Sequence, residues 1–120
     1  MADKKKLERD FQATLIKELK ELFKGCMVIK LDSSYLQGIP DLLILYKKKW
    51  ATLECKKSSR AKRRPNQEYY VGLMDSMSFS RFICPENKEE VLNDLQQTFK
   101  SGRTTCVSGS KQIPLDKLLG

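Results

Sequence analysis

The chain has 120 residues, of which 40% are hydrophobic and 32% are charged, and its formal net charge is +8. This length supports one domain with a single modest core, and the composition is typical of a folded soluble protein. The sequence contains no histidine. This excludes Ser-His-Asp hydrolases, zinc enzymes with histidine ligands and nucleases that use histidine as the base. Any catalysis must therefore come from carboxylates, lysine and a hard metal ion.

The charge and the distribution of apolar residues limit the partners and the compartment. A net charge of +8 suits a polyanion such as nucleic acid. No apolar run approaches the ~18 residues of a membrane span, and the first residues lack the apolar segment of a signal peptide. The cysteines form no C-x-x-C pair, and Cys26, Cys55 and Cys84 lie in apolar segments. We therefore expect a cytoplasmic protein with reduced, buried thiols and no contact with a membrane.

Residues 5–24 predict an amphipathic helix that carries one acid on its apolar face. At about 100° per residue, the leucine, isoleucine and phenylalanine side chains fall within a sector of about 180° that starts at Leu7. Glu8 falls at about 100°, in the middle of this sector. A carboxylate that faces a core needs a partner or an opening. Glu8 therefore escapes to water near the helix start, pairs with Lys4 or Lys5, or leans over an active site.

Gly25 ends this helix, and strands are predicted at residues 26–31, 41–46 and 50–56. The middle strand, DLLILY, is almost wholly apolar, which is typical of a strand buried on both faces. Pro40 favours an extended residue before it and marks the entry to this strand.

A hairpin between the second and third strands would gather three charged residues. Side chains alternate along a strand, so Glu54 and Lys56 share one face. An even-length turn within residues 47–49 and their neighbours would place Asp41 across from one of them, at one end of the sheet. Lys-Lys is a poor two-residue turn because it lacks the Gly, Asn or Asp that adopts positive φ. We expect a four-residue turn or a bulge to relieve this conflict.

The second half of the chain predicts a helix from Pro65 to about residue 77, a strand over residues 80–84, and a helix that begins with the capping-box pattern Asn87-x-x-Glu90. Residues 102–120 form either a short strand at 104–107 or an extension that packs on a partner. The expected order is α-β-β-β-α-β-α. We predict an α/β domain over residues 1–101, with a mixed central sheet flanked by helices and a C-terminal extension over residues 102–120.

The converging acids predict a site for a hard divalent cation. Asp41 and Glu54 supply oxygen ligands suited to Mg²⁺ or Mn²⁺, and the main-chain carbonyl of Cys55 is a plausible further ligand. Such an ion would polarise a phosphate and acidify a bound water. Lys56 would orient that water and neutralise transition-state charge, and Glu8 could complete the metal site. The alternative is an ordinary salt bridge on a sheet, because Glu-x-Lys alone is common.

Pro40-Asp41 followed by Glu54-Cys55-Lys56 resembles the PD-(D/E)xK nuclease superfamily. Within it, GIPDLLIL, LECK and then Pro65-Asn66-Gln67 are similar to the VRR-NUC group, small stand-alone members of which occur in phages. The same spacing resembles archaeal Holliday junction resolvases, and the likeness covers residues 8–95.

The resemblance implies a restriction-endonuclease-like core and a metal-dependent DNA endonuclease. The residues matched by Glu8, Asp41, Glu54 and Lys56 form the catalytic set of the family, and the residue matched by Gln67 lies beside it. The chain departs from the family at Cys55, where an aliphatic residue is usual. Since its side chain points away from the acids, this departure affects the assignment little.

The basic run after the third strand would contact the DNA backbone, or else form a solvated loop. Its candidate phosphate-binding residues are Lys57, Arg60, Lys62, Arg63 and Arg64. We predict a Mg²⁺-dependent, structure-specific endonuclease, a Holliday junction resolvase that acts as a homodimer on branched DNA. The alternatives are a general or nicking nuclease in phage replication or host DNA breakdown, and a non-catalytic DNA-binding protein of the same fold.

Overall fold

A computed structural model describes residues 4–100, with side chains from residue 7 onward. The elements in this range follow the order α-β-β-β-α-β-α, as predicted. They are α1 (Lys4–Leu22), β1 (Met27–Lys30), β2 (Leu42–Tyr46), β3 (Lys49–Cys55), α2 (Pro65–Met77), β4 (Ser80–Ile83) and α3 (Lys88–Lys100). The predicted extension at residues 102–120, with its alternative strand, lies outside the described residues.

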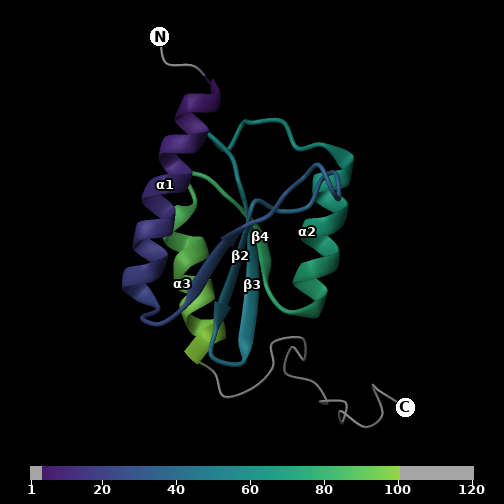
Figure 1. Cartoon of the computed structure of the whole chain (residues 1–120). Coiled ribbons are helices and arrows are strands. Elements are labelled where there is room, and N and C mark those ends of the chain that lie inside the picture. Colours follow the sequence, from purple (N-terminus) through teal and green to yellow (C-terminus); the bar gives the residue numbers. More distant parts are fainter. Residues whose placement is uncertain (1–3, 101–120) are drawn as a thin grey trace, which may run out of the picture.

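The strands form one mixed sheet in the order β1-β2-β3-β4. β1, β2 and β3 pair antiparallel, whereas β3 and β4 pair parallel. The parallel pair needs a crossover connection, and α2 supplies it. Helices α1 and α3 lie on one side of the sheet and α2 lies on the other (Figure 1). The expected α/β class with a mixed sheet flanked by helices is therefore confirmed.

The hydrophobic core lies between the sheet and the α1–α3 layer. It is built from buried residues of α1, β2, β3, β4 and α3, including Leu15, Leu19, Leu42, Ile44, Ala51, Leu53, Ile83 and Leu95. The apolar stripe predicted for α1 is wider than the stripe that is buried. Leu7 and Leu22, at the two ends of the helix, are 47% and 41% exposed.

The β2–β3 hairpin has a two-residue turn. Tyr46 pairs with Lys49, so only Lys47 and Lys48 lie between the strands. The expectation of a four-residue turn or a bulge is therefore wrong. Lys47 instead adopts a left-handed φ of 57°, a conformation that costs an L-residue roughly 1–2 kcal/mol. The continuous strand pairing on either side offsets this local cost.

The strand register places the two acidic residues at the end of the hairpin opposite to the turn. Leu42 pairs with Leu53, so one further step places Asp41 across from Glu54. This is one of the two registers expected from the alternation of side chains. Because Asp41 precedes β2 and Glu54 is the penultimate residue of β3, both lie at the end of the sheet opposite to the turn.

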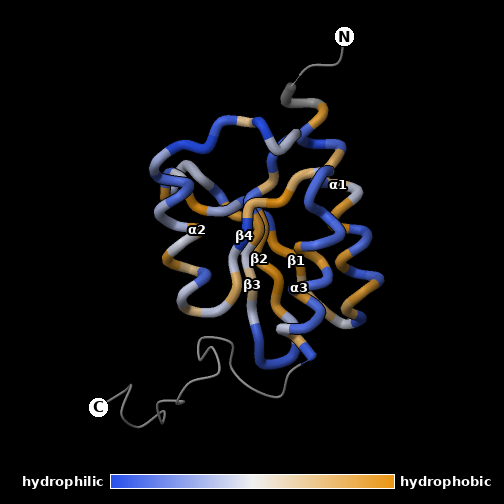
Figure 2. Tube along the Cα trace, turned by 180° about the vertical axis from the view of Figure 1, so that it is seen from behind, coloured by the Kyte–Doolittle hydropathy of each residue, from blue (hydrophilic) through white to orange (hydrophobic). Residues whose placement is uncertain are grey.

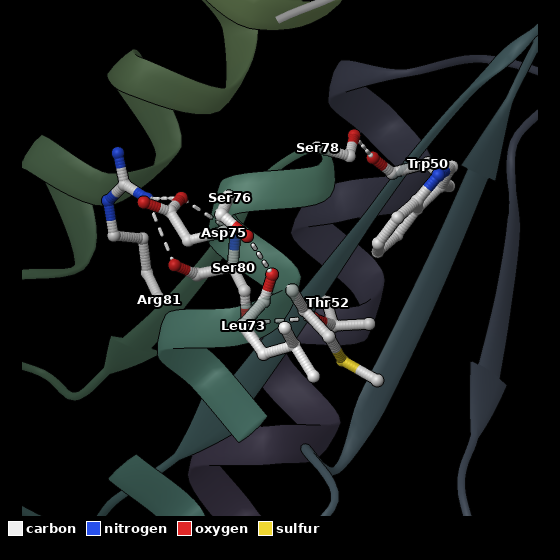
Figure 3. A network of polar contacts seen from close by, with 9 residues as sticks. Trp50, Thr52, Leu73, Asp75, Ser76, Ser78, Ser80 and Arg81 are labelled. Carbon is white, nitrogen blue, oxygen red and sulfur yellow. Dashed lines mark hydrogen bonds and ion pairs between the residues drawn. The ribbon is translucent and has the colours of Figure 1, made fainter. Parts of the chain in front are cut away.

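A polar network fixes α2 against β3 and β4 (Figure 3). The hydroxyl of Thr52 on β3 donates to the hydroxyl of Ser80 on β4 at 2.8 Å, and both side chains are buried. Asp75, near the end of α2, accepts a hydrogen bond from the backbone N–H of Ser80 and pairs with Arg81. These contacts set the position of α2 over the sheet and thereby the position of its first turn.

The α2 side of the sheet is only partly covered. α2 packs on β3 and β4, and the side chains of β2 that face this layer, Leu43 and Leu45, are half-buried and 36% exposed respectively. The prediction that β2 is buried on both faces is therefore wrong for its second face within the described residues. Figure 2 shows that β1 and β2 are nonetheless strongly hydrophobic.

Three smaller predictions are resolved in this range. Cys26, Cys55 and Cys84 are free thiols; Cys55 and Cys84 are buried and Cys26 is half-buried. The side-chain oxygen of Asn87 accepts from the backbone N–H of Cys84, and its amide donates to the carbonyl of Phe82. Asn87, directly before α3, therefore ties the start of this helix to β4. None of the described helices has the length and hydrophobicity needed to cross a membrane.

Candidate functional site

A pocket of about 760 Å³ opens at the end of the hairpin opposite to the turn. Four of the predicted site residues line it: Glu8 from α1, Asp41 and Glu54 from the hairpin, and Gln67 from α2. These residues are far apart in the sequence, and the sheet register and the position of α2 bring them together. The pocket therefore brings acidic side chains of α1 and the hairpin together with the first turn of α2.

Asp41 and Glu54 are carboxylates held in a desolvated position. Asp41 Oδ2 accepts a hydrogen bond of 2.9 Å from the backbone N–H of Cys55. Glu54 is only 3% exposed, and its Oε2 accepts from Nε2 of Gln67 at 2.8 Å. Its other oxygen, Oε1, is buried without a hydrogen-bond partner among the described residues. A buried carboxylate oxygen of this kind needs a proton or a cation.

Burial and mutual repulsion raise the pKa values of these acids. Burial, followed by the neighbouring charge of Asp41, raises the pKa of Glu54 from 4.5 to about 8. Burial also raises the pKa of Asp41, against the opposing effect of the Cys55 N–H and of Lys56. Two carboxyl groups whose ionised forms disfavour each other form a site that a divalent cation would relieve.

Gln67 connects the lysine of the site to the acid. Its Oε1 accepts from Nζ of Lys56 at 2.8 Å and from the backbone N–H of Arg64 at 3.0 Å, while its Nε2 donates to Glu54. Lys56 Nζ also donates to the carbonyl of Lys62 at 3.0 Å and lies 3.9 Å from Oε2 of Glu54. The first turn of α2 therefore fixes the lysine beside the carboxylate, although Lys56 lines the adjoining basic pocket and not the acidic one.

Glu8 lies over the site. It is half-buried and lines the pocket with Asp41 and Glu54. Burial, and next the charge of Asp41, raise the pKa of Glu8, while Lys56 and Lys57 act in the opposite direction. Of the three positions considered for Glu8, the structure favours the one at the site. The alternative partners Lys4 and Lys5 lie outside the residues whose side chains are described.

The donor set fits a cation held mainly by two carboxylates. Among the side chains of residues 7–100, no three acidic, cysteine or histidine groups are close enough to share one ion. Asp41 and Glu54 are the two candidates, and Mg²⁺ is commonly held by one or two carboxylates with water and substrate oxygens completing its shell. Glu8 would then act through water. The role of the Cys55 carbonyl stays a prediction; its side chain is buried in the core, which raises the thiol pKa well above its usual value.

A second, basic pocket of about 640 Å³ adjoins the first. The two share Glu8, Lys62, Arg64 and Gln67 in their linings. The further basic residues of the second pocket are Lys56, Lys57 and Arg60. The loop that carries them has internal hydrogen bonds, and its Ser59 bonds to Glu86 beyond β4, so it has a defined shape on the protein. Figure 2 shows this loop as a largely hydrophilic arch.

Arg63 is the one predicted phosphate-binding residue that the structure places elsewhere. Its guanidinium lies 4.1 Å from the centroid of the Phe82 ring, and it lines a separate pocket of about 420 Å³ beside α3. Consecutive residues of an extended loop point in different directions, and a cation–π contact holds Arg63 on the far side. Spacing in the sequence alone does not indicate which members of a basic run point away.

Sequence reasoning missed the wall formed by the β1–β2 loop. Ser33, Ser34, Gln37 and Gly38 line the acidic pocket together with Asn66 of α2. Gly38 has a φ of +93°, and a Cβ placed on it would lie 2.5 Å from Cβ of Asn66. The loop therefore packs directly on α2 at this point. The polar run just before Pro40-Asp41 was the available signal for this wall.

No protein-family model matches the chain, and comparisons with curated proteins and with solved structures likewise found no match.

Proposed function

We propose that the protein is a metal-dependent, structure-specific DNA endonuclease with a restriction-endonuclease-like core, acting as a Holliday junction resolvase. The observation that carries the proposal is the buried, unpartnered Oε1 of Glu54 beside Asp41, with Lys56 held next to them by Gln67. An ordinary salt bridge on a sheet would leave no carboxylate oxygen buried without a partner. Its lysine would neutralise the acid directly, whereas Lys56 stands 3.9 Å from the nearer oxygen.

The side chains of the pocket suit phosphodiester hydrolysis. Asp41 and Glu54 would hold Mg²⁺ or Mn²⁺, which supplies charge neutralisation at the phosphate and a more acidic water. Lys56 is oriented by Gln67 and would direct the attacking water and stabilise the charge that develops on phosphorus oxygens. Glu8, with its raised pKa, would accept or relay a proton through water.

The basic pocket suits the DNA backbone on either side of the bond that is cut. Lys57, Arg60, Lys62 and Arg64 lie around it, next to the acids. Each phosphate contact that they make would add about −0.9 to the slope of log K against log[salt]. The acidic pocket would carry out the hydrolysis and the basic pocket would bind the DNA backbone. Both pockets would therefore contact the same DNA strand.

Symmetrical cutting of a four-way junction requires two sites. Each chain supplies one, so the proposed resolvase acts as a homodimer on DNA. A general or nicking nuclease in phage replication or host DNA breakdown would need no such symmetry. A non-catalytic DNA-binding protein would need no buried acids.

The experiment compares the protein with the Asp41→Ala variant on four-way junctions, flaps, duplexes and single strands, with Mg²⁺ or with EDTA. We expect paired, symmetrical nicks on junctions in Mg²⁺ only, and a loss of at least ~10³-fold with Asp41→Ala. Asp10→Ala is the matched control, because Asp10 is an exposed acid of α1 outside both pockets.

The outcomes separate the candidate functions. Equal cutting of all substrates would indicate the general nuclease. An absence of metal-dependent cutting, or cutting by Asp41→Ala at the rate of Asp10→Ala, would refute the catalytic proposal. Junction binding that persists without cutting would indicate the DNA-binding protein.

A further inference from the structure

A hydrophobic surface lies on the α2 side of the sheet, apart from the candidate site. We call it the open sheet face. It consists of Met27, Leu43, Leu45, Trp50, Leu73 and Met77. Met27 is 59% exposed and Met77 is 54% exposed, and none of the six residues is buried.

The strand register places the sheet residues of this surface on one face. Met27 pairs with Leu45, and Leu45 pairs with Trp50, so these three side chains form one row across β1, β2 and β3. Leu43 lies two residues from Leu45 and therefore on the same face. The neighbouring residues Leu42 and Ile44 point to the opposite face and are fully buried there.

The orientation of α2 about its own axis adds Leu73 and Met77 to the open sheet face. Met74 faces β3, because its Sδ lies 3.5 Å from the hydroxyl oxygen of Thr52. Asp75 lies toward β4, where it contacts Ser80. At about 100° per residue, Leu73 and Met77 then project from the side of α2 that faces away from β4 and toward β2. The helix thus borders the apolar row and does not cover it.

The open sheet face is concentrated at the turn end of the hairpin. Leu45 and Trp50 form the pair next to the last one before the turn. Met77 is the last residue of α2, and the hydroxyl of Ser78 after it donates to the carbonyl of Trp50. The acidic and basic pockets lie at the opposite end, so nucleic acid bound there would not cover this surface.

The described part of the chain finishes at this same end. Nζ of Lys49, the first residue of β3, donates to the carbonyls of Thr98 and Phe99 in the last turn of α3. Residues 101–120 follow directly, and five of them are large and aliphatic: Val107, Ile113, Leu115, Leu118 and Leu119. At ~3.3 Å per extended residue, about six residues reach ~20 Å, enough to pass round the end of a sheet layer.

We propose that the C-terminal segment 101–120 docks on the open sheet face of its own chain. A tethered segment has a high effective concentration at a surface close to its attachment point. A second copy is disfavoured in free solution, because each chain carries a net charge of +8 and the two would repel. The segment supplies the apolar cover that the pattern of β2 demands and that the described residues lack.

The test places a photoreactive phenylalanine analogue at Leu45 in the full chain. Natural-abundance and ¹⁵N-labelled chains are mixed, irradiated and digested, and the adducts are mapped by mass spectrometry. We expect adducts on peptides from residues 101–120, with both partners of the same isotope. The control carries the analogue at Tyr35, which is 91% exposed on the β1–β2 loop at the other end of the sheet and should give no such adduct.

A second variant carries Leu115→Ser, Leu118→Ser and Leu119→Ser in the full chain. It should reduce the yield of these adducts at least ~tenfold without changing the circular dichroism of the domain. Mixed-isotope adducts would overturn the proposal in favour of a second copy. Absence of any adduct at Leu45, or a yield unaffected by the three serines, would also overturn it.

Discussion

The two ends of the β2–β3 hairpin are built on different principles. At the turn end, Tyr46 contacts the rings of Phe23 and Phe99 at centroid distances of 5.3 and 5.6 Å, and Lys49 bonds to the end of α3. At the open end, Asp41 and Glu54 are desolvated side by side, and one carboxylate oxygen has no partner among the described residues.

The difference separates stability from chemistry. Aromatic packing at the turn end holds Phe23, just after α1, together with β2 and α3, and it is independent of the ionisation of the acids. The open end loses stability by burying charges, and this loss is recovered when a cation or a proton arrives. Substitutions at the turn end should therefore lower the stability of the fold and leave the cleavage rate of the folded protein unchanged. Substitutions at the open end should lower the cleavage rate and leave the stability largely unchanged.

The largest stability effect is expected for Phe99→Ala. This change removes a 5%-exposed ring from contact with Phe23 and Tyr46, and should lower the free energy of unfolding by about 3 kcal/mol. Urea denaturation in EDTA measures it, and the cleavage rate of the folded fraction should be unchanged. Tyr35→Ala is the control, because this exposed ring should contribute little to stability. Equal losses of stability for the two variants would contradict the conclusion that aromatic packing at the turn end stabilises the fold.

Glu8→Gln should reverse this pattern. We expect a cleavage rate about 10²-fold lower, because a group that relays a proton is lost, with no decrease in stability at neutral pH. Burial raises the pKa of Glu8, so a neutral amide is tolerated at least as well as the acid. Glu21→Gln, an exposed acid of the same helix, should leave the rate unchanged. A Glu8→Gln variant with full activity would show that its position over the pocket is incidental.

The pH dependence of stability should report the raised pKa of the buried acid at the open end. The pKa of Glu54 is raised from 4.5 to about 8 on folding, mainly by burial, so the folded state binds the proton more tightly than the unfolded chain. Its contribution to metal-free stability therefore falls by up to ~1.4 kcal/mol per pH unit between those values. Denaturation in EDTA at pH 5, 6.5 and 8 measures the slope. Glu54→Gln should flatten the pH slope of stability, and Mg²⁺ should reduce the slope of the unmodified protein. A slope that is unchanged in Glu54→Gln would contradict its assignment to Glu54.

The smallest expected effect lies in the turn. Lys47→Gly should stabilise the fold by ~0.5 kcal/mol, because glycine adopts the φ of 57° without a Cβ penalty but loses more chain entropy on folding. Lys48→Gly is the matched control and should destabilise the protein by ~0.5 kcal/mol, since it brings the entropy cost alone. Thermal denaturation with EDTA measures both, and a lower melting temperature for Lys47→Gly would contradict the interpretation.

The sequence predicts the convergence of the acids well, because it depends on periodicity. Alternation along β3 and the parity of the hairpin place Asp41 across from Glu54, and the helical period places Glu8 on the inner side of α1. Each of these inferences needs only one element or two adjacent ones.

The remaining features depend on contacts between distant segments. The turn at Lys47 contradicts local preference because pairing of the flanking strands overrides it. Arg63 leaves the basic pocket because Phe82, on β4, attracts it. The face of β2 that the described residues leave open depends on how far α2 extends across the sheet, and the sequence of β2 does not contain this information.

The contact between Gly38 and Asn66 determines how wide the acidic pocket opens. With no Cβ at position 38, the β1–β2 loop rests on the first turn of α2, the turn that also carries Gln67. Any larger residue at position 38 would act as a wedge between the two walls. Gly38 therefore sets how closely the two walls of the acidic pocket approach each other, and a side chain at this position should force the loop and the first turn of α2 apart.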